Sequence, residues 1–514
     1  MKNDNLKFKF ILFLIFLFSG FLMWGNVEAA CTGSSPTWTC TANTSSTDIQ
    51  ACITGATAGD TINIGAGTGT WDGRIEITKS IKLVGAGIGQ TIINSNYSPT
   101  IVGGLISENY LITVKPATPA DNPVIRISGF TLNVNTGGSY GIFYYNTSTT
   151  PPLYELTNVR FDHLEISSGT LKYPFVRYGL AFGVMDNCKL HTGYIFDNGG
   201  NPQLWTYGSY TPGVSSNFYY EDNEWDALTS ESMTQMDTNG ASHWVFRYNN
   251  ITTPIDAQTF PLLMMHGNQT SGSSGVGAEI YGNDVIAEKT SNWDMAFFIQ
   301  RGGQATVFDN RITWTRPGCS ASIRVREEWP DEDGLGVAIN PINGQPQHVS
   351  SSYYWTNLGN DSPLVPLLDL EACTNVGSAV QDDDACYNGL SPKRGIEENI
   401  DWFAGDGVAV FDGTLKTNAG VGCGTPAARP ATCTIGVAYW ATNQSCTDMT
   451  GMVGAVDPEG DRPDVSYKIE GTLYKCTDTD TWEEYYTPYT YPHPLRTEAY
   501  DIVAPASPTG LAVQ

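Results

Sequence analysis

The chain has 514 residues and a formal net charge of −26, with 53 Asp and Glu against 27 Lys and Arg. A surface this acidic repels other polyanions and argues against nucleic acid as a partner. Charged residues make up only 16% of the chain, so the acidity reflects a shortage of basic residues rather than an acidic tail. An acidic polysaccharide would therefore need a local basic patch or a bridging cation.

Residues 1–29 are predicted to be a signal peptide. Lys2, Lys7 and Lys9 precede an apolar run over residues 10–24, and small residues near Ala29 offer a cleavage site. The run is short for a membrane span and no second one follows. We expect a secreted or extracellular protein, with the periplasm or the cell surface as further locations, and no membrane span.

The next pattern, over residues 46–93, predicts a short helix followed by short strands. Apolar residues fall on one face over 48–56, which indicates the helix. A Gly59-Asp60 turn leads into strands predicted at 61–64, 75–77, 81–84 and 91–93, with a Gly85-Ala86-Gly87 turn before the last. Strands broken by glycine turns favour a coil of strands over hairpins.

A phrase of apolar residue, polar residue, Asn and apolar residue recurs along the middle third, with Phe161 to Ile166 as a looser copy. Its Asn residues are spaced by 36, 27, 33 and 27 positions, a period typical of a solenoid. Asn tolerates a tight bend and bonds to an Asn stacked above it, so we predict a structural ladder. Its members are Asn187, Asn223, Asn250, Asn283 and Asn310.

Residues 46–315 resemble pectate-lyase-like right-handed parallel β-helix proteins. The matching residues are Ile49 to Ile53, Gly59-Asp60 and Leu83-Val84-Gly85-Ala86-Gly87, together with the Asn phrases. The resemblance implies an all-β right-handed parallel β-helix with an N-terminal capping helix. That scaffold carries lyases, hydrolases, esterases and non-catalytic adhesins, so it does not fix an activity.

Four segments are predicted: a signal peptide (1–29), the β-helix (30–360), a C-terminal capping region (361–500), and a linker with a stub (501–514). The capping region is expected because the last coil of a solenoid needs a cover over its open strand edges. The stub resembles the first strand of a fibronectin type III module.

Eleven cysteines in an exported chain favour disulfides, and most cluster near the two ends. Spacing does not prove connectivity. The predicted pairs are Cys31–Cys40, Cys373–Cys386, Cys423–Cys433 and Cys446–Cys476. Cys52, Cys188 and Cys319 remain, and Cys188 is expected to be a buried apolar filler.

Registering the coils on their Asn residues places one ionisable residue at a similar offset in each coil. These residues are Asp237, His266, Arg301 and Arg326. Stacked, they would form a column in which His266 acts as acid or base, an Arg neutralises a uronate, and Asp237 orients the His or holds a cation. Arg247 would border this face and bind substrate. The alternative is that polar residues simply end the strands and neutralise one another.

The residues of well-defined catalytic subfamilies are absent. Paired Asp phrases, Gly-His-Gly and Arg-x-Pro-x-x-Arg do not occur. Carboxylates crowd two bends near residues 221–226 and 327–333, where solvated turns are expected, and calcium is the cofactor that such turns would bind. Trp205, Tyr207 and Trp225 lie in an aromatic stretch and are predicted to bind sugar rings.

Two functional hypotheses stay open. The first is a polysaccharide lyase or glycoside hydrolase acting along a groove of the helix. The second is a non-catalytic adhesin, surface protein or glycan-binding structural protein. Both have a polysaccharide or surface glycan as partner, and the sequence leaves the oligomeric state undetermined.

Overall fold

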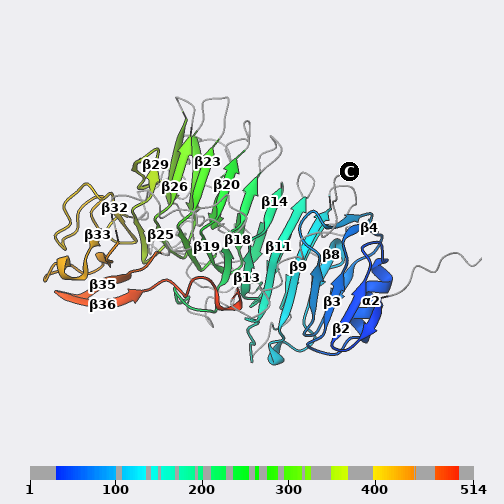
Figure 1. Ribbon diagram of the computed structural model, residues 1–514. Helices are drawn as coiled ribbons and strands as arrows, with labels where there is room; N and C mark the ends of the chain where they lie inside the picture. The colour runs from blue at the N-terminus through cyan, green and yellow to red at the C-terminus, as the bar shows by residue number, and fades with distance from the viewer. Residues whose placement is uncertain are drawn as a thin grey trace, which may run out of the picture.

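The computed structural model describes residues 31–99, 107–134, 140–146, 148, 152–167, 173–191, 195–200, 210–226, 236–253, 261–265, 275–287, 294–314, 319–325, 349–368, 397–444, 446 and 469–496. The predicted signal peptide and the fibronectin-like stub lie outside these residues. The chain is a right-handed parallel β-helix, in which successive coils stack along one axis (Figure 1). The predicted fold class is confirmed.

Each coil contributes one strand to a ten-stranded parallel sheet, here called sheet B. Its strands are β5 (Ile75–Ile77), β8 (Tyr110–Val114), β10 (Tyr140–Tyr145), β12 (Phe175–Tyr178), β15 (Ile195–Asn198), β18 (Met236–Asn239), β21 (Leu263–Met265), β24 (Asp294–Gln300), β27 (Ser320–Val325) and β31 (Pro366–Leu368).

The other strands of the coils form a 22-stranded sheet that bends once in each coil. The strands before the bend make the upstream face: β2 (Thr37–Cys40), β3 (Thr61–Ile64), β6 (Lys82–Gly85), β13 (Gly183–Asp186), β16 (Phe218–Glu221), β19 (His243–Arg247), β22 (Gly277–Tyr281), β25 (Gln304–Phe308), β28 (Ser352–Trp355) and β32 (Trp402–Gly405). Because β31 and β32 pair with β27 and β28, the coils continue past the boundary predicted at residue 360.

The strands after the bend make the downstream face: β4 (Gly67–Trp71), β7 (Thr91–Ser95), β14 (Lys189–His191), β17 (Glu224–Asp226), β20 (Asn250–Thr253), β23 (Asp284–Ala287), β26 (Arg311–Trp314) and β29 (Leu358–Gly359). Two longer strands, β9 (Ile125–Asn133) and β11 (Val159–Ser167), run through the bend and belong to both faces. Short antiparallel strands β1 (Thr32–Ser34) and β30 (Ser362–Pro363) pair with β2 and β29.

Helix α2 (Ser46–Gly55) covers the N-terminal end of the core, as the sequence predicted. Ser45 caps it by accepting a hydrogen bond from the backbone N–H of Asp48 at 3.1 Å. Ile49, Cys52 and Ile53 are buried against the first coils. Single 3₁₀ turns occur at η1 (Ser107–Asn109), η2 (Pro119–Asp121), η5 (Pro426–Ala428) and η6 (Pro494–Arg496).

The bend between the two faces uses two successive positions in each coil. The first is a residue in the left-handed region, with φ between 50° and 67° from the coil of His163 to the coil of Thr356. In the five successive coils from Asn223 to Asn357 the second position carries a buried Asn, and each Nδ2 before the last donates to Oδ1 of the Asn in the next coil. The four bonds are Asn223 to Asn249 (3.0 Å), Asn249 to Asn283 (3.1 Å), Asn283 to Asn310 (2.8 Å) and Asn310 to Asn357 (2.8 Å).

This ladder satisfies every polar atom of the asparagine side chain. Each Oδ1 also accepts the backbone N–H of the ladder residue in the preceding coil. Each Nδ2 also donates to a backbone carbonyl of that coil, as Asn283 does to Phe246 at 2.9 Å. A buried amide is stable only when its donors and acceptors are paired, and here the pairing itself locks the coils in register.

The structure contains an asparagine ladder, but Asn187 and Asn250, two of the residues predicted to form it, are not members. Asn187 occupies the left-handed position, and Asn250 is the first residue of β20, one position past the ladder residue Asn249. Cys188 takes the ladder position of its coil, buried as expected. Its backbone N–H donates to Oδ1 of Asn223 at 3.0 Å, and its thiol donates to the carbonyl of Phe161 at 3.7 Å.

The C-terminal region covers the upstream face from β11 onward as well as the end of the solenoid. Strands β33 (Val421–Gly424), β34 (Ala438–Ala441), β35 (Thr472–Asp478) and β36 (Thr481–Tyr486) form a separate sheet. Trp440 of this sheet packs on Phe308 and Trp355 of the solenoid, with ring centroids 5.1 and 5.2 Å apart. Residues 487–496, the C-terminal segment, then run back along the solenoid towards β13 (Figure 1).

Two disulfides of this region differ from the prediction. Cys31–Cys40 is confirmed, but the C-terminal pairs are Cys423–Cys446 and Cys433–Cys476, not Cys423–Cys433 and Cys446–Cys476. Antiparallel pairing of β34 with β35 brings Cys476 beside the chain that enters β34 at Cys433, 43 residues earlier. Strand pairing, not proximity in sequence, sets the connectivity. The predicted Cys373–Cys386 pair lies outside the described residues.

The ladder register predicts different results for two asparagines at adjacent positions. Replacing Asn283 with Ala removes an amide that pairs with two coils and leaves buried polar groups unsatisfied. We expect a loss of about 3 kcal/mol in the free energy of unfolding. Asn250→Ala, on the outer face, should change it by less than about 0.5 kcal/mol. Equal losses in chemical denaturation would show that the register is wrong.

The C-terminal segment gives a second stability prediction. Arg496 contacts Asp186, Glu221 and Asp222, and Arg496→Ala would leave these buried carboxylates short of a cation. We expect a loss of about 3 kcal/mol. Lys416→Ala, which removes an exposed pair with Asp412, should leave the denaturation midpoint unchanged. A midpoint equally unaffected by Arg496→Ala would contradict a stabilising role for the segment.

Candidate functional site

The downstream face presents two rows of outward side chains, at the first and third positions after the ladder. Residues facing each other across paired strands are neighbours, so each row is continuous over the stacked coils. The first row comprises Thr131, Glu165, Lys189, Glu224, Asn250, Asp284 and Arg311; the second comprises Asn133, Ser167, His191, Asp226 and Thr252. Ionisable groups of both signs alternate along these rows.

His191 of β14 is held between two carboxylates from the neighbouring coils. Its Nε2 lies 3.0 Å from Oε1 of Glu165 on β11, and its Nδ1 bonds to Oδ1 of Asp226 on β17. The side chains of His191, Glu165 and Asp226 are 15%, 25% and 33% exposed, so the cluster is ordered yet open to solvent. We call these three residues the His191 cluster.

The two carboxylates determine the protonation of this histidine. Only the imidazolium form donates a hydrogen bond from both ring nitrogens. The bond to Asp226 raises the pKa of His191 most; burial opposes the rise, and the charge of Asp226 and the bond to Glu165 add to it. His191 is therefore suited to act as a proton donor near neutral pH.

Glu165 is fixed by the coil on its other side. Its Oε2 accepts a hydrogen bond of 2.7 Å from the Thr131 hydroxyl, which in turn accepts the N–H of Gly89 at 2.8 Å. Lys189, beside it in the first row, pairs with Glu224 at 3.2 Å. The carboxylate of Glu165 is thus oriented towards His191 by a chain of hydrogen bonds that connects four coils.

A second histidine, His163, lies at the bend and has a different environment. Its Nδ1 is 2.8 Å from Oδ2 of Asp162, a buried carboxylate that also accepts two bonds from Arg126. Burial alone would raise the pKa of Asp162, but Arg126, His163 and Arg160 hold it well below its usual range. This ion network connects neighbouring coils, and His163 therefore serves as a control for variants of His191.

Two residues of the predicted ionisable column, Asp237 and Arg301, are not in the same row. Asp237 pairs in register with Phe196 and Met264, whereas Arg301 follows Gln300, the partner of Met265. Asp237 and Arg301 therefore lie two register positions apart on sheet B. His266 and Arg326 lie outside the described residues, so their role stays a prediction.

Two predicted substrate-binding residues are buried. Arg247 points outward from β19 as alternation predicts, but the C-terminal segment covers it. Its guanidinium bonds to Glu221 and to the carbonyls of Tyr489 and Thr490 at 2.7 and 2.9 Å. Trp225 points inward and packs on Phe246 in the core. Trp205 and Tyr207 lie outside the described residues.

The acidic bend near residue 221 is also not a solvated turn. Glu221 and Asp222 are buried and bind Arg496 of the C-terminal segment, and Tyr491 donates its hydroxyl proton to Asp222 at 2.9 Å. The other two carboxylates of the bend, Glu224 and Asp226, bond to Lys189 and His191. All four bond to protein groups, and Glu224 and Asp226 are also partly exposed.

Sheet B carries outward aromatic residues that the sequence interpretation missed. A partly exposed aromatic layer lies on and next to strands β10, β12 and β15, and it covers the buried residues Tyr110, Phe143 and Val176. This layer consists of Tyr140, Tyr145, Tyr173, Tyr178 and Phe196. Ring contacts fix their orientation, as between Tyr145 and Tyr178, whose centroids lie 5.3 Å apart. The alternation of Ile142 and Tyr144, which point into the core, with Phe143 and Tyr145 would have revealed an outward aromatic face.

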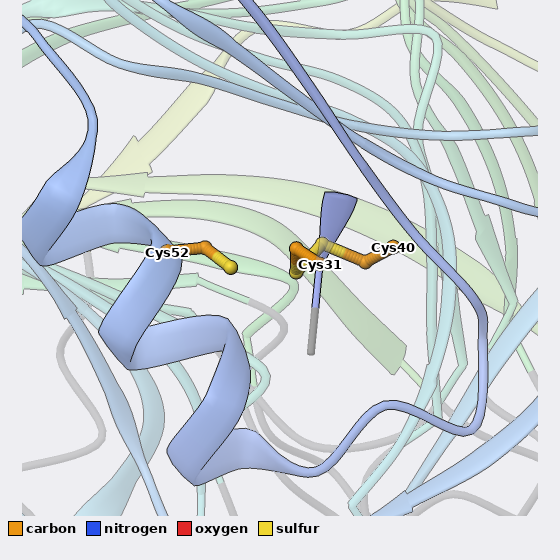
Figure 2. Close-up of side chains that lie close together, drawn as sticks. All are labelled: Cys31, Cys40 and Cys52. Carbon is orange, nitrogen blue, oxygen red and sulfur yellow. A yellow bond between two sulfur atoms is a disulfide. The ribbon is translucent and has the colours of Figure 1, made fainter. Parts of the chain in front are cut away.

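Within the described part of the chain, one group of side chains has the closeness needed for a metal ion. It consists of the sulfurs of Cys31, Cys40 and Cys52, two of which form a disulfide (Figure 2). Calcium binds oxygen ligands, so this group does not correspond to the calcium site considered above.

Over the same residues, no helix has the length and apolar character of a membrane span.

No protein-family model matches the sequence, and no curated protein matches it either. Two similar solved structures are A-modules of mannuronan C-5 epimerases from Azotobacter vinelandii. The AlgE4 module is 14% identical, with 63% of this chain and 93% of that chain covered and a TM-score of 0.26. The AlgE6 module is also 14% identical, with coverages of 63% and 91% and a TM-score of 0.28.

The His191 cluster predicts a titration that can be measured by NMR. The pKa of the His191 imidazole should lie above its ordinary value of 6.5 and should fall in Asp226→Asn, since the largest cause of the rise is removed. The associated stability is present below the unfolded pKa and is lost as pH rises through the folded pKa. A pKa unchanged by Asp226→Asn would contradict the geometry.

Proposed function

We propose that this protein is a glycoside hydrolase that cleaves a neutral polysaccharide across the downstream face, with His191 as the proton donor. The observation that carries the proposal is the His191 cluster: a partly exposed imidazole bonded at both nitrogens to carboxylates on adjacent coils. The two rows of polar side chains on the downstream face repeat once per coil, which suits a ligand that is itself a repeating chain.

The charge of the cluster supports a neutral substrate. Two carboxylates around one imidazolium leave a net charge of −1, on a chain whose formal charge is −26. The nearest cation, Lys189, is already paired with Glu224. An acidic polysaccharide would therefore be repelled where a lyase needs to neutralise a uronate.

The three groups of the cluster account for every proton that moves in the hydrolytic step. His191 transfers one proton to the glycosidic oxygen as the bond to the anomeric carbon breaks. Water adds to that carbon and gives its proton to Glu165 or Asp226, from which His191 is reprotonated. The step divides the acid and base roles between an imidazolium and a carboxylate, whereas most glycoside hydrolases use two carboxyl groups.

A second candidate function is glycan binding without turnover, and the aromatic layer of sheet B favours it. Tyr140, Tyr145, Tyr173 and Tyr178 combine flat apolar rings with hydroxyl groups, on strands that succeed one another along the axis. Such side chains bind sugar faces with little loss of conformational entropy, because their own contacts already order them.

The experiment is a screen of neutral and acidic polysaccharides for new reducing ends and for unsaturated-uronate absorbance. We expect reducing ends without absorbance from a neutral substrate. His191→Asn should lower the turnover number at least 100-fold, because general acid catalysis contributes at least that factor. His163→Asn is the matched control and should retain activity, since Asn tolerates the left-handed backbone at that position.

Two outcomes would overturn the proposal. Absorbance from an acidic substrate would establish a lyase instead. Absence of products from all substrates, with retention on one glycan that Tyr145→Ala and Tyr178→Ala both weaken, would establish the second candidate function.

A further inference from the structure

Three sulfur atoms meet at the N-terminal end of the solenoid. Cys31 and Cys40 form a disulfide, and Cys52 is a free thiol on helix α2. All three Sγ atoms lie within 4.8 Å of one another. Figure 2 shows the Cys52 side chain pointing from the helix towards the disulfide. A thiol so placed is positioned to attack one of the disulfide sulfurs.

We propose that this cluster is a thiol–disulfide exchange site, in which Cys52 displaces Cys31 and forms a Cys40–Cys52 disulfide. The thiol of Cys52 gives its proton to a solvent base, and the thiolate attacks Sγ of Cys40. The Cys31–Cys40 bond breaks, and Cys31 leaves as a thiolate that is protonated by solvent. The step consumes no oxidant or reductant, because one disulfide replaces another.

The burial of the three cysteines selects Cys40 as the sulfur that is attacked. Cys40 and Cys52 are both buried at the interface between strand β2 and helix α2, whereas Cys31 is partly exposed. A thiolate that leaves towards water is better solvated than one released into the core, so Cys31 is the favoured leaving group. Burial and, to a smaller extent, Asp48 raise the pKa of Cys52, while the backbone N–H of Cys31 opposes the rise.

The exchange changes what the disulfide holds together. The Cys31–Cys40 bond closes a loop between residues only 9 positions apart and does not include helix α2. A Cys40–Cys52 bond would instead tie the capping helix to the first coil, whose core Ile49 and Ile53 cover. The N-terminal cover of the solenoid would then be fixed covalently, and a partly exposed Cys31 thiol would become available.

The test begins with Cys31→Ser, incubated in an oxidising glutathione buffer at mildly alkaline pH. After acid quenching, unfolding and alkylation, peptide mapping should show Cys40 joined to Cys52 in most molecules. Cys31→Ser with Cys52→Ser is the matched control and should leave Cys40 without that intramolecular bond. Cys40 and Cys52 both alkylated in Cys31→Ser would overturn the proposal.

The unmodified protein provides a measurement that does not depend on a variant folding. With a trace of thiol, the mapped disulfides should include Cys40–Cys52 alongside Cys31–Cys40, and Cys31 should gain alkylation to the same extent. Cys188, buried in the ladder, should not enter any disulfide. Only Cys31–Cys40 after prolonged incubation, or Cys31–Cys52 in place of Cys40–Cys52, would contradict the assignment.

Discussion

The hydrogen-bonded asparagine at the bend of each coil is the interaction on which the other features of this solenoid depend. A parallel coil has no hairpin to fix its register, and a slip of one residue would turn every core side chain outward. The ladder prevents this because each amide bonds to the coil before it and the coil after it. The residue before it, in the left-handed region, turns the chain so that the Asn points inward.

Once the register is fixed, alternation along the strands decides which side chains are outside. Columns such as Leu190, Trp225, Ile251 and Val285 fill the core, while the residues between them face outward. The outward residues meet three environments. From β11 onward the upstream face is covered by the protein's own C-terminal region, whereas sheet B carries the aromatic layer and the downstream face carries the His191 cluster. The functional differences between the faces therefore arise from this covering and from the outward side chains of the other two faces.

The fold could be predicted because its signals are local, and the errors occurred where local signals end. Tyr248-Asn249-Asn250-Ile251 offers two asparagines, and the sequence alone does not reveal that the first is buried. Outward alternation correctly placed Arg247, but the segment that covers it is more than 240 residues away. The predicted column lies at offsets of fourteen and more from the Asn residues, which excludes His191. The third position after the ladder residues Cys188 and Asn223 holds His191 and Asp226, so the same register at that offset pairs these two residues.

The sealing of the upstream face also determines where free charge remains for chemistry. Arg160, Arg247 and Arg496 are matched there by Asp186, Glu221 and Asp222, so the buried network is close to neutral and its groups are fully engaged. An ion pair of this kind stabilises the docked segment but has no capacity to exchange a proton with a ligand. In the His191 cluster the cation is a titratable imidazole rather than a guanidinium, and its two carboxylate partners are partly exposed, so the imidazole can lose its proton without leaving a buried charge uncompensated. A titratable cation between partly exposed carboxylates distinguishes the candidate catalytic group from the arginine pairs and from His163, whose partner Asp162 is buried.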